Sequence, residues 1–442
     1  MVTLKRALSF WELTLVGVGI ILGAGIYVLI GEAAGLSGNM VWLSFIVAAV
    51  VASLTGLSYA ELASLFPKAG AEFVFTEKAF NKRLAFIIGW LLLVTPIISA
   101  AAVSLGFAGY FSAFFNTPII LTAIGALIFL SFILFYGIKE SAWFAIICAI
   151  IEIIGLIIII FLGIPYFGSV DYFELPPELG FAGVLAAGAL VFFAYIGFED
   201  MANMAEEVKN PTHSVPNAIV MSIIISTVLY ILVGIASVSV MGWEALSQSS
   251  APLAEVASVS LGNNAFMLLG AIALFATANT VLLILLAGSR MMYGMARGNV
   301  LPKIVGKLHS VRQTPWVAII LLLLASIIFV TIGNIGTVAN MTNVTILSTF
   351  FVINISAIVL RYKNIKLKRK FKTPINIGKF PVLSFLGAIS CFVLILQMEG
   401  SILLFGAGVV ILGYILSYLF VKKDFKAEKI QKVISKHKSK KR

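Results

Sequence analysis

The chain has 442 residues, of which 61% are hydrophobic and only 11% are charged, and its mean hydropathy is +1.08. A soluble domain carries about 25% charged residues, so this composition excludes a soluble globular protein and indicates repeated membrane crossings. The two cysteines, Cys148 and Cys391, lie in apolar stretches, and no Cys/His cluster has the spacing of a metal site. No cleavable signal peptide is expected, because the first apolar stretch is too long.

Apolar stretches of about 20 residues, each long enough to cross a bilayer, recur along the chain. They predict an all-α polytopic protein with twelve spans. Between the ninth and tenth spans the one turn signal is Gly333 to Gly336, and the alternative is a single long hairpin in this region. The twelve spans lie near residues 10–35, 40–66, 83–113, 118–137, 141–165, 182–205, 215–241, 264–296, 315–334, 337–361, 380–398 and 400–421.

The charges divide between the two sides of this topology. All 31 Lys and Arg residues fall on one side. The positive-inside rule places that side, and with it both termini, in the cytoplasm. The chain is therefore expected to be a multi-pass protein of the cell (plasma) membrane. The basic tail is long enough to contact anionic lipid, and nucleic-acid binding is not expected, because no DNA-binding fold accompanies the basic residues. The other side carries only acidic residues: Asp171, Glu174, Glu178, Glu244, Glu255 and Glu399.

Two spans are interrupted near their midpoints. Gly23-Ala24-Gly25 interrupts the first span, and Tyr195-Ile196-Gly197-Phe198 interrupts the sixth. Lipid cannot hydrogen-bond a broken backbone, and breaks at matching positions are typical of transport sites. Freed N–H groups near Gly25, Ile26 and Tyr27 suit a carboxylate, and freed carbonyls one turn earlier suit an ammonium or another cation. The alternative is that the glycines only let helices pack closely.

The two interrupted spans are expected to run in opposite directions, because five spans separate their starts. Spans 1–5 and 6–10 would then form an inverted repeat. Glu199 and Asp200 follow the second interruption, where a carboxylate costs roughly 2.5–3.5 kcal/mol on insertion scales, so they should face a cavity or a partner. The expected division is a cytoplasmic N-terminus (1–9), a first repeat (10–165, with an amphipathic inner loop at 67–82), a second repeat (182–361), two further helices (380–421) and a basic tail (422–442).

Several motifs in the same order resemble the amino acid–polyamine–organocation (APC) superfamily, most closely its basic amino-acid and archaeal or bacterial amino-acid permeases. The motifs occupy residues 23–27, 66–70, 193–199, 206–211 and 288–293. The resemblance covers spans 1–10, and it implies a five-plus-five inverted-repeat fold, as in sodium symporters, with helices 1 and 6 broken at mid-membrane. It also implies a substrate site between helices 1, 3, 6, 8 and 10.

The resemblance further implies which residues bind substrate. Backbone N–H groups of Ala24, Gly25 and Ile26 would bind the carboxylate, and carbonyls near Phe193, Ala194 and Ile196 would bind the amine. Phe193 and Phe198 are candidate gates, although core packing is an equal alternative for Phe193. Glu199 lies where some exchangers have a functional Glu. The complete candidate substrate site is Ile20, Gly23, Ala24, Gly25, Ile26, Phe193, Ala194, Ile196 and Gly197.

Glu152 lies at the centre of the otherwise apolar fifth span. The resemblance places Glu152 where proton-coupled relatives carry a Lys. Because Glu has the opposite charge, the coupling mechanism of that Lys cannot be assigned unchanged to this chain. A carboxyl group removed from water can exchange a proton near neutral pH. Alternatively, it holds a cation such as sodium beside Thr277, Asn279 or Thr280, or it is a structural Glu bonded to a neighbouring helix. The candidate coupling residues are therefore Glu152, Glu199, Thr277 and Thr280.

Other polar residues have less specific interpretations. Glu12 and Glu61 are expected to pair with nearby bases, and Glu32 to line the outer entrance. The amphipathic segment 67–82, which contains Glu72, is expected to form a re-entrant or interfacial helix that is part of the inner gate, and the alternative is a solvated loop. Residues 244–261 are expected to hold a short outer helix. The polar residues of span 10 are either pocket residues or interhelical hydrogen-bonding residues; these are Asn340, Asn343 and Thr345.

The sequence therefore predicts a secondary active transporter that moves an α-amino acid by alternating access, through proton-coupled symport or amino-acid exchange. The alternatives are a polyamine or organic-cation carrier, or an amino-acid sensor that retains the carrier fold. An enzyme is not expected, because the three histidines (His213, His309 and His437) are not clustered. The expected partners are an amino acid, a proton or sodium ion, and membrane lipid, with no cofactor, metal, nucleic acid or obligate protein partner.

Overall fold

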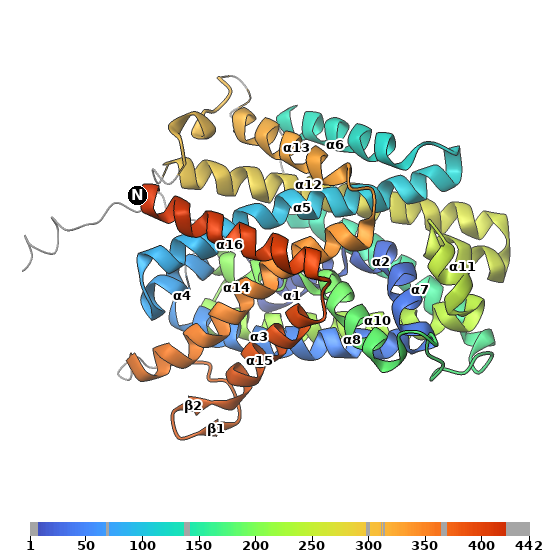
Figure 1. Cartoon of the computed structure of the whole chain (residues 1–442), viewed down its shortest axis with the longest axis horizontal. Coiled ribbons are helices and arrows are strands. Elements are labelled where there is room, and N and C mark those ends of the chain that lie inside the picture. Colours follow the sequence, from blue (N-terminus) through green and yellow to red (C-terminus); the bar gives the residue numbers. More distant parts are fainter. Residues whose placement is uncertain are drawn as a thin grey trace, which may run out of the picture.

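The computed structural model describes residues 8–67, 70–136, 142–297, 301–310, 312, 314–363 and 369–420, without the side chains of 142–149 and 206. The N-terminal segment 1–7, the basic tail and the Cys148 side chain therefore lie outside the described residues. The chain is almost entirely helical, and α5 (Lys82–Phe115), α12 (Asn263–Arg297) and α16 (Gly400–Phe420) run nearly along the long axis of the molecule (Figure 1).

The first half of the chain contains α1 to α7. The boundary between α1 and α2 falls at the expected interruption, and Ser9 caps α1 through a hydrogen bond from the Glu12 N–H group at 3.4 Å. The Glu12 carboxylate accepts the Ser9 N–H at 2.7 Å and completes a capping box. The positive charge of Lys209 lies close enough to act on the same carboxylate, which agrees with the expected pairing of Glu12 with a nearby base. The elements are α1 (Phe10–Leu22), α2 (Gly25–Ser37), η1 (Gly38–Met40), α3 (Val41–Leu65), α4 (Ala71–Ala79), α5, α6 (Ile119–Tyr136), α7 (Ala142–Gly163) and η2 (Ile164–Tyr166).

The second half contains the other interrupted helix and a small β-hairpin. The turn at Gly333, whose φ is +78°, separates α13 from α14, so this region forms two helices. The expected outer helix is α11. The elements are α8 (Gly180–Val191), η3 (Phe192–Tyr195), α9 (Asp200–Asn203), η4 (Ala205–Glu207), α10 (Pro211–Gln248), α11 (Pro252–Leu261), α12, η5 (Lys303–Gly306), α13 (Trp316–Val330), α14 (Ile335–Lys363), β1 (Asn376–Ile377), β2 (Phe380–Pro381), α15 (Val382–Leu396) and α16.

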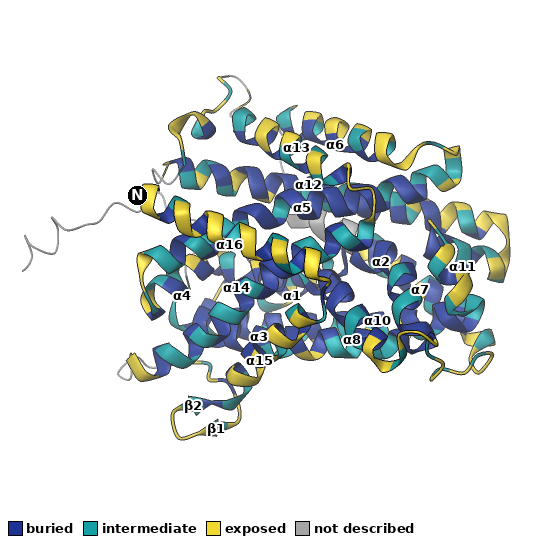
Figure 2. Ribbon diagram, in the orientation of Figure 1, coloured by how far each residue is buried: buried dark blue, intermediate teal, exposed yellow. Residues whose placement is uncertain are grey.

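The lengths and side chains of these helices identify a multi-pass membrane protein. In the part of the chain that the structure describes, eight helical stretches are long and apolar enough to cross a membrane, and the 41-residue stretch Gly25–Leu65 contains both α2 and α3. Large apolar side chains are exposed along α6, α13 and α16, whereas α1, α2 and α14 are mostly buried (Figure 2). The outward apolar faces suit contact with lipid, and the polar groups of the buried helices face protein.

A buried ion-pair cluster fixes one end of the bundle. Glu61 of α3 is 1% exposed, and its carboxylate accepts hydrogen bonds from Arg361 at 2.5 and 2.8 Å and from Arg369 at 3.0 Å. The N–H and hydroxyl groups of Thr373 add bonds at 2.9 and 2.7 Å. The expected pairing of Glu61 with local bases is confirmed. The cluster joins α3, the end of α14 and the segment before β1, and we call this end of the molecule the basic end.

The opposite end carries acidic side chains and is held by a different polar network. Asn39, after α2, donates from Nδ2 to the Asp171 carbonyl oxygen at 3.1 Å and to Glu174 Oε2 at 2.8 Å. Trp243 Nε1 donates to Glu174 Oε1 at 3.3 Å. These bonds tie the loop after α7 to η1, between α2 and α3, and to α10. We call this end the acidic end; it also contains Glu32 and Glu399.

Candidate functional site

The two helix interruptions have different backbone conformations. α1 ends at Leu22, Gly23 has a φ of 10° and a ψ of −149°, and α2 begins at Gly25. At the second interruption, α8 tightens into η3, and the backbone then turns to an extended ψ of 134° at Ile196 and reaches a φ of +120° at Gly197. Only glycine readily adopts that φ. Both interruptions that the sequence predicts are therefore present.

The interruptions lie directly against each other. A Cβ atom added to Gly25 would be 2.6 Å from the Ala194 Cα atom, and one added to Gly197 would be 2.3 Å from the Ile20 Cγ2 atom. Such distances leave no room for a side chain at either glycine. The structure thus brings together Ile20, Gly25, Ala194 and Gly197, which lie about 170 residues apart in the sequence.

We call the contact between the two interruptions, residues 20–27 and 193–198, the junction. The start of α2 offers backbone N–H donors there. The Ala24 N–H group donates to the Thr280 hydroxyl of α12 at 3.1 Å, and that hydroxyl donates in turn to the Ala276 carbonyl oxygen at 2.8 Å. Gly25, Ile26 and Tyr27 are the first residues of a helix, so their N–H groups have no acceptor within it. These donors and the positive end of the helix dipole favour a bound carboxylate.

Tyr230 of α10 bridges the two interruptions, a role that the sequence does not reveal. Its hydroxyl oxygen lies 2.6 Å from the Ile21 carbonyl oxygen and 2.8 Å from the Ala194 carbonyl oxygen. A tyrosine hydroxyl has one proton, so the two carbonyls share a single donor. An ammonium group, with three donors, would complete both bonds. The available sequence signal was a lone tyrosine inside an apolar span, without a motif around it.

Glu152 is buried in α7 and only partly satisfied. It is 1% exposed, its carboxylate interacts with the Asn279 side chain of α12, and its Oε1 atom has no hydrogen-bond partner among the described residues. The Tyr27 hydroxyl donates to the Glu152 carbonyl oxygen at 2.8 Å, which ties α7 to α2 just after the first interruption. Glu152 therefore lies one contact away from the junction.

The two threonines expected beside Glu152 have different environments. Thr277 donates to the carbonyl oxygens of Ala273 and Leu274 within its own helix, at 2.7 and 3.1 Å. Thr280 instead lies at the first interruption, where Gly23 also approaches its side chain. Of the two, Thr280 is thus placed to act on the junction.

Phe198 belongs to an aromatic cluster on the basic-end side of the junction. Its ring centroid lies 5.7 Å from that of Tyr59 in α3 and 5.1 Å from that of Phe350 in α14. Phe198 is fully buried, and Phe193 is 8% exposed. The cluster connects the interrupted helix to two neighbouring helices, so any movement of this segment must displace packed rings. A gating role for Phe193 or Phe198 stays a prediction.

Carboxyl groups gather where the second interruption meets α4. Glu199 Oε2 accepts the Gly197 N–H at 2.8 Å and so stabilises the non-helical turn. Glu72 of α4 is 3% exposed and accepts hydrogen bonds from Asn203 Nδ2 at 3.3 Å and from the Tyr59 hydroxyl at 3.4 Å. Asn203 Oδ1 accepts the Ala71 N–H at 2.8 Å. The amphipathic loop is therefore a helix docked on the segment after the interruption.

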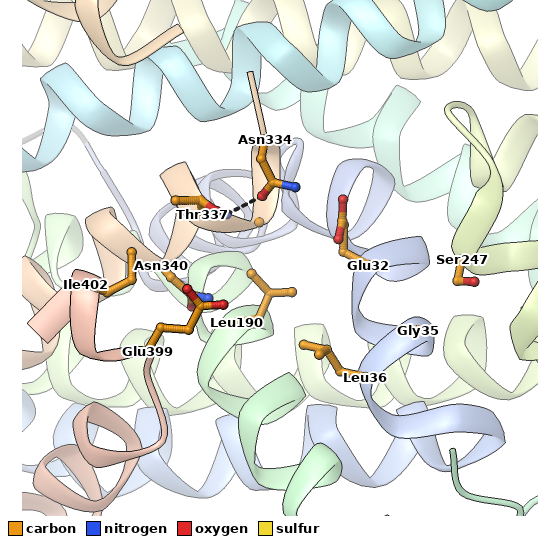
Figure 3. A pocket seen from close by; sticks show the side chains of 11 residues that line it. Glu32, Gly35, Leu36, Leu190, Ser247, Asn334, Thr337, Asn340, Glu399 and Ile402 are labelled. Atoms are coloured by element: carbon orange, nitrogen blue, oxygen red, sulfur yellow. Dashed lines mark hydrogen bonds between the residues drawn. The ribbon is translucent and has the colours of Figure 1, made fainter. Parts of the chain in front are cut away.

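The polar residues of α14 mostly hold helices together. Asn343 Nδ2 donates to the carbonyl oxygens of Ala189 and Leu190 at 2.8 and 3.0 Å, near the end of α8. Thr345 and Thr95 of α5 share a hydrogen bond of 2.9 Å. Asn340 instead lines a pocket at the acidic end (Figure 3). Within the described ranges, no group of three or more His, Cys, Asp or Glu side chains is placed to hold a metal ion.

The burial of Glu72 predicts that the stability of the protein depends on pH. Burial raises the pKa of Glu72 to about 7, and the charge of Asp200 adds to this effect. The folded state therefore binds this proton more tightly than the unfolded state does. The free energy of unfolding should fall as pH rises from about 4.5 to about 7, by about 3 kcal/mol in total. Thermal unfolding of detergent-solubilised Glu72→Gln between pH 5 and 8 should give a flatter profile than the native protein.

The matched control is Glu178→Gln, which changes an exposed acidic residue at the other end of the molecule. Its profile should follow that of the native protein. Parallel profiles for the native protein and Glu72→Gln would show that Glu72 does not take up a proton in this pH range.

The sequence matches known transporters over almost its whole length. The pattern that defines the amino acid permease family covers residues 8–420. The branched-chain amino acid permease BcaP of Bacillus subtilis is 32% identical over 96% of this chain and 95% of its own length. The methylthioribose transporter of the same organism is 30% identical over 90% of this chain and 89% of its own length. Cationic amino acid transporter 4 of Mus musculus is 32% identical over 82% of this chain and 60% of its own length.

These similarities fit the geometry, in which two helix interruptions meet inside a bundle of apolar helices. Permeases move solutes across membranes without changing them chemically, and the relatives are named as transporters, so the chain is a transporter and not an enzyme. The protein is a member of the amino acid permease family, within the APC superfamily.

Proposed function

We propose that this protein carries an α-amino acid across the cell membrane by alternating access. The observation that supports the proposal most directly is the junction of the two interruptions. There, N–H donors at the start of α2 that have no acceptor within their helix lie near two carbonyls, those of Ile21 and Ala194, that share one hydroxyl proton. A zwitterion carries both complementary groups, a carboxylate for the donors and an ammonium for the acceptors.

The names of the relatives agree with this substrate class. A branched-chain amino acid permease and a cationic amino acid transporter share 32% identity with the chain. A methylthioribose transporter is nearly as similar, so methylthioribose should be included among the competitors in any uptake assay. A polyamine carrier is the second candidate, because the carboxyl groups of Glu72, Glu199 and Asp200 gather beside the interruption and could accept hydrogen bonds from an amine.

The proposed topology has twelve spans, with spans 1–5 and 6–10 as inverted repeats. The basic end, with the Glu61 cluster, faces the cytoplasm of the plasma membrane, and the acidic end faces outward. Alternating access would then move the helix bundle around the bound substrate, so that the junction opens to each of these two ends in turn. The docked helix α4 and the aromatic cluster around Phe198 would form the closed inner side.

Proton coupling through Glu152 is the proposed driving mechanism. A buried carboxyl oxygen without a partner is costly, and it is relieved when a proton or a cation binds. Glu152 contacts Tyr27 through its backbone and Asn279 through its side chain. Binding of a proton or a cation at Glu152 would therefore affect two helices. One is α2, on one side of the junction, and the other is α12, which carries Thr280 on the opposite side.

The primary test reconstitutes the Gly25→Leu variant into proteoliposomes and measures its uptake of labelled amino acids. The new side chain would collide with Ala194, since even a Cβ atom would lie 2.6 Å from the Ala194 Cα atom. We expect normal membrane insertion and complete loss of uptake. The control is Gly125→Leu in α6, where a Cβ atom meets nothing within 4 Å; its uptake should be normal. Normal uptake by Gly25→Leu would contradict a site at this junction.

Tyr230→Phe should reduce transport efficiency. The substitution removes the hydroxyl that bonds both interruptions and leaves two buried carbonyls without a donor, at a cost of about 1–3 kcal/mol. We expect kcat/KM for amino-acid uptake to fall about tenfold, which corresponds to about 1.4 kcal/mol. Tyr110→Phe removes an equally buried hydroxyl that donates to the Tyr27 carbonyl oxygen at 2.8 Å, and it should lower stability with a smaller effect on uptake. Equal effects of both variants would assign Tyr230 a purely structural role.

Glu152→Gln should separate proton coupling from exchange. Glutamine keeps the size of the side chain and its contact with Asn279 but cannot release a proton. Native uptake should increase when the outside is acidified, whereas the variant should lose this response and still exchange internal for external amino acid. An unchanged response to the pH gradient would exclude Glu152 as the proton carrier, and dependence on sodium in the native protein would favour the cation-ligand alternative.

A further inference from the structure

The hairpin formed by β1 and β2 exposes apolar side chains at the basic end. Ile375, just before β1, is 64% exposed, and Ile377 within β1 is 75% exposed. The hairpin projects from the helix bundle beside the start of α15 (Figure 1), and much of its surface is exposed (Figure 2). Isoleucines held in water lose the free energy that burial of their side chains would supply. The hairpin therefore presents a surface that fits a partner of low polarity.

The residue between the two isoleucines faces the protein. Asn376 Nδ2 donates to the Thr373 carbonyl oxygen at 2.7 Å, and Asn376 Oδ1 accepts a hydrogen bond from Arg361. Successive side chains of a strand point to opposite faces. The polar side of the hairpin is thus fixed to the Glu61 cluster, and its apolar side is turned outward. A hairpin surrounded by water would have the reverse arrangement.

Ile375 adopts a backbone conformation that isoleucine rarely takes. Its φ is +55°, and a β-branched residue is strained at positive φ. Glycine would remove the strain, but it would also remove the exposed side chain. The Ile375 carbonyl oxygen accepts the Val382 N–H at 3.2 Å, which ties this residue to the start of α15. The strain is offset if the Ile375 side chain is removed from water.

The helix that follows the hairpin is short for a membrane span. α15 has 15 residues, which correspond to about 22 Å, whereas the hydrocarbon core of a bilayer is about 30 Å thick. At the acidic end the chain continues with the polar Gln397 and then Glu399. The missing apolar length must therefore come from the basic end. There, the two extended residues of β2 add about 7 Å.

The apolar surface of α15 continues onto the hairpin. Phe385, Leu386 and Ile389 are exposed along α15 and suit contact with lipid. The Phe385 ring contacts that of Phe380 in β2, with centroids 5.4 Å apart, and Phe380 pairs with Ile377 across the hairpin. The exposed isoleucines thus extend a surface that already faces lipid.

Exposed lysines flank these isoleucines on both sides. Lys372 precedes them, and Lys379 lies in the turn between the strands, beside Gly378, whose φ is +61°. A lysine can lay its aliphatic stem along apolar surface and place its ammonium group among polar headgroups. Basic residues next to a membrane are attracted to anionic lipids. An apolar face between two cations therefore fits the surface of an anionic membrane.

We propose that this hairpin anchors the basic end in the headgroup layer of an anionic membrane. Ile375 and Ile377 insert at the boundary with the acyl chains, and Lys372 and Lys379 bind lipid phosphate groups. Because Asn376 joins the hairpin to the Glu61 cluster, lipid contact would stabilise the packing of α3 against α14. The inference requires only that the chain spans a membrane, so it does not depend on which solute is transported.

The first test measures thermal unfolding of the full chain in nanodiscs of phosphatidylcholine, with and without phosphatidylglycerol. A ligand that binds the folded state raises the unfolding midpoint, so phosphatidylglycerol should raise the midpoint of the native protein. The increase should fall by at least half in the double variant Lys372→Gln/Lys379→Gln. The basic tail is the same in all variants, so its contribution to lipid binding does not affect the comparison.

The matched control for the lipid response is Lys209→Gln. Lys209 is exposed in the loop before α10, and no large apolar side chain is exposed next to it among the described residues. This variant should retain the native increase. Equal increases in the native protein and in the double variant would overturn the inference.

The second test measures the depth of the hairpin directly. A fluorophore is attached to Ile377→Cys in a Cys148→Ser background, where Cys391 is fully buried. Spin-labelled lipids with the nitroxide near the headgroup should quench this fluorophore, and aqueous iodide should not. The same fluorophore on Lys209→Cys should show the opposite pattern. Iodide quenching at Ile377→Cys as strong as at Lys209→Cys would show that the hairpin lies in water and would contradict the anchor.

Discussion

Backbone hydrogen bonding inside the bilayer is the constraint on which the rest of the structure depends. A helix that stops within an apolar environment must find partners for its free N–H and C=O groups from the protein. Here each interruption is supported by side chains from other helices: Thr280 accepts the Ala24 N–H, Tyr230 donates to Ile21 and Ala194, and Glu199 accepts the Gly197 N–H. The support is incomplete, because one hydroxyl proton serves two carbonyls and the first N–H groups of α2 have no acceptor in their helix. That incompleteness is what makes the junction suitable for a ligand.

Close contact between the interruptions depends on the absence of side chains. Gly25 lies against Ala194, and Gly197 lies against Ile20, at distances that no Cβ atom could occupy. The glycines therefore have two roles that the sequence alone could not distinguish. They weaken the helix, because glycine has a low helix propensity, and they allow the two backbones to touch, as the alternative of close packing required. In this protein the two interpretations describe the same contact.

The parts of the structure that depend on local pattern were predictable, and those that depend on side chains from distant elements were not. The helix interruptions, the Ser9 cap and the α11 helix follow from glycine positions, capping residues and apolar spacing. The pairing of Glu61 with some base follows from the separation of charges between the two sides, but the identity of its partners, Arg361 and Arg369, does not. Tyr230 is more than 30 residues from either interruption that it bridges, and a lone tyrosine in an apolar span carries no pattern. An amphipathic interfacial helix would expose Glu72 on its polar face, but the docking of α4 on Asn203 and Tyr59 buries this side chain.

Two buried glutamates show how the same residue type acquires different roles. Both Glu61 and Glu152 are 1% exposed. Glu61 has two arginines and the two donors of Thr373 around its carboxylate, so its charge is compensated and its oxygens are bonded. Removing one partner of such a pair costs about 3–5 kcal/mol, which suits an anchor. Glu152 has the neutral Asn279 and an oxygen without a partner among the described residues. Under the proposed proton coupling, the link from Glu152 through Tyr27 to α2 would connect proton binding to the junction.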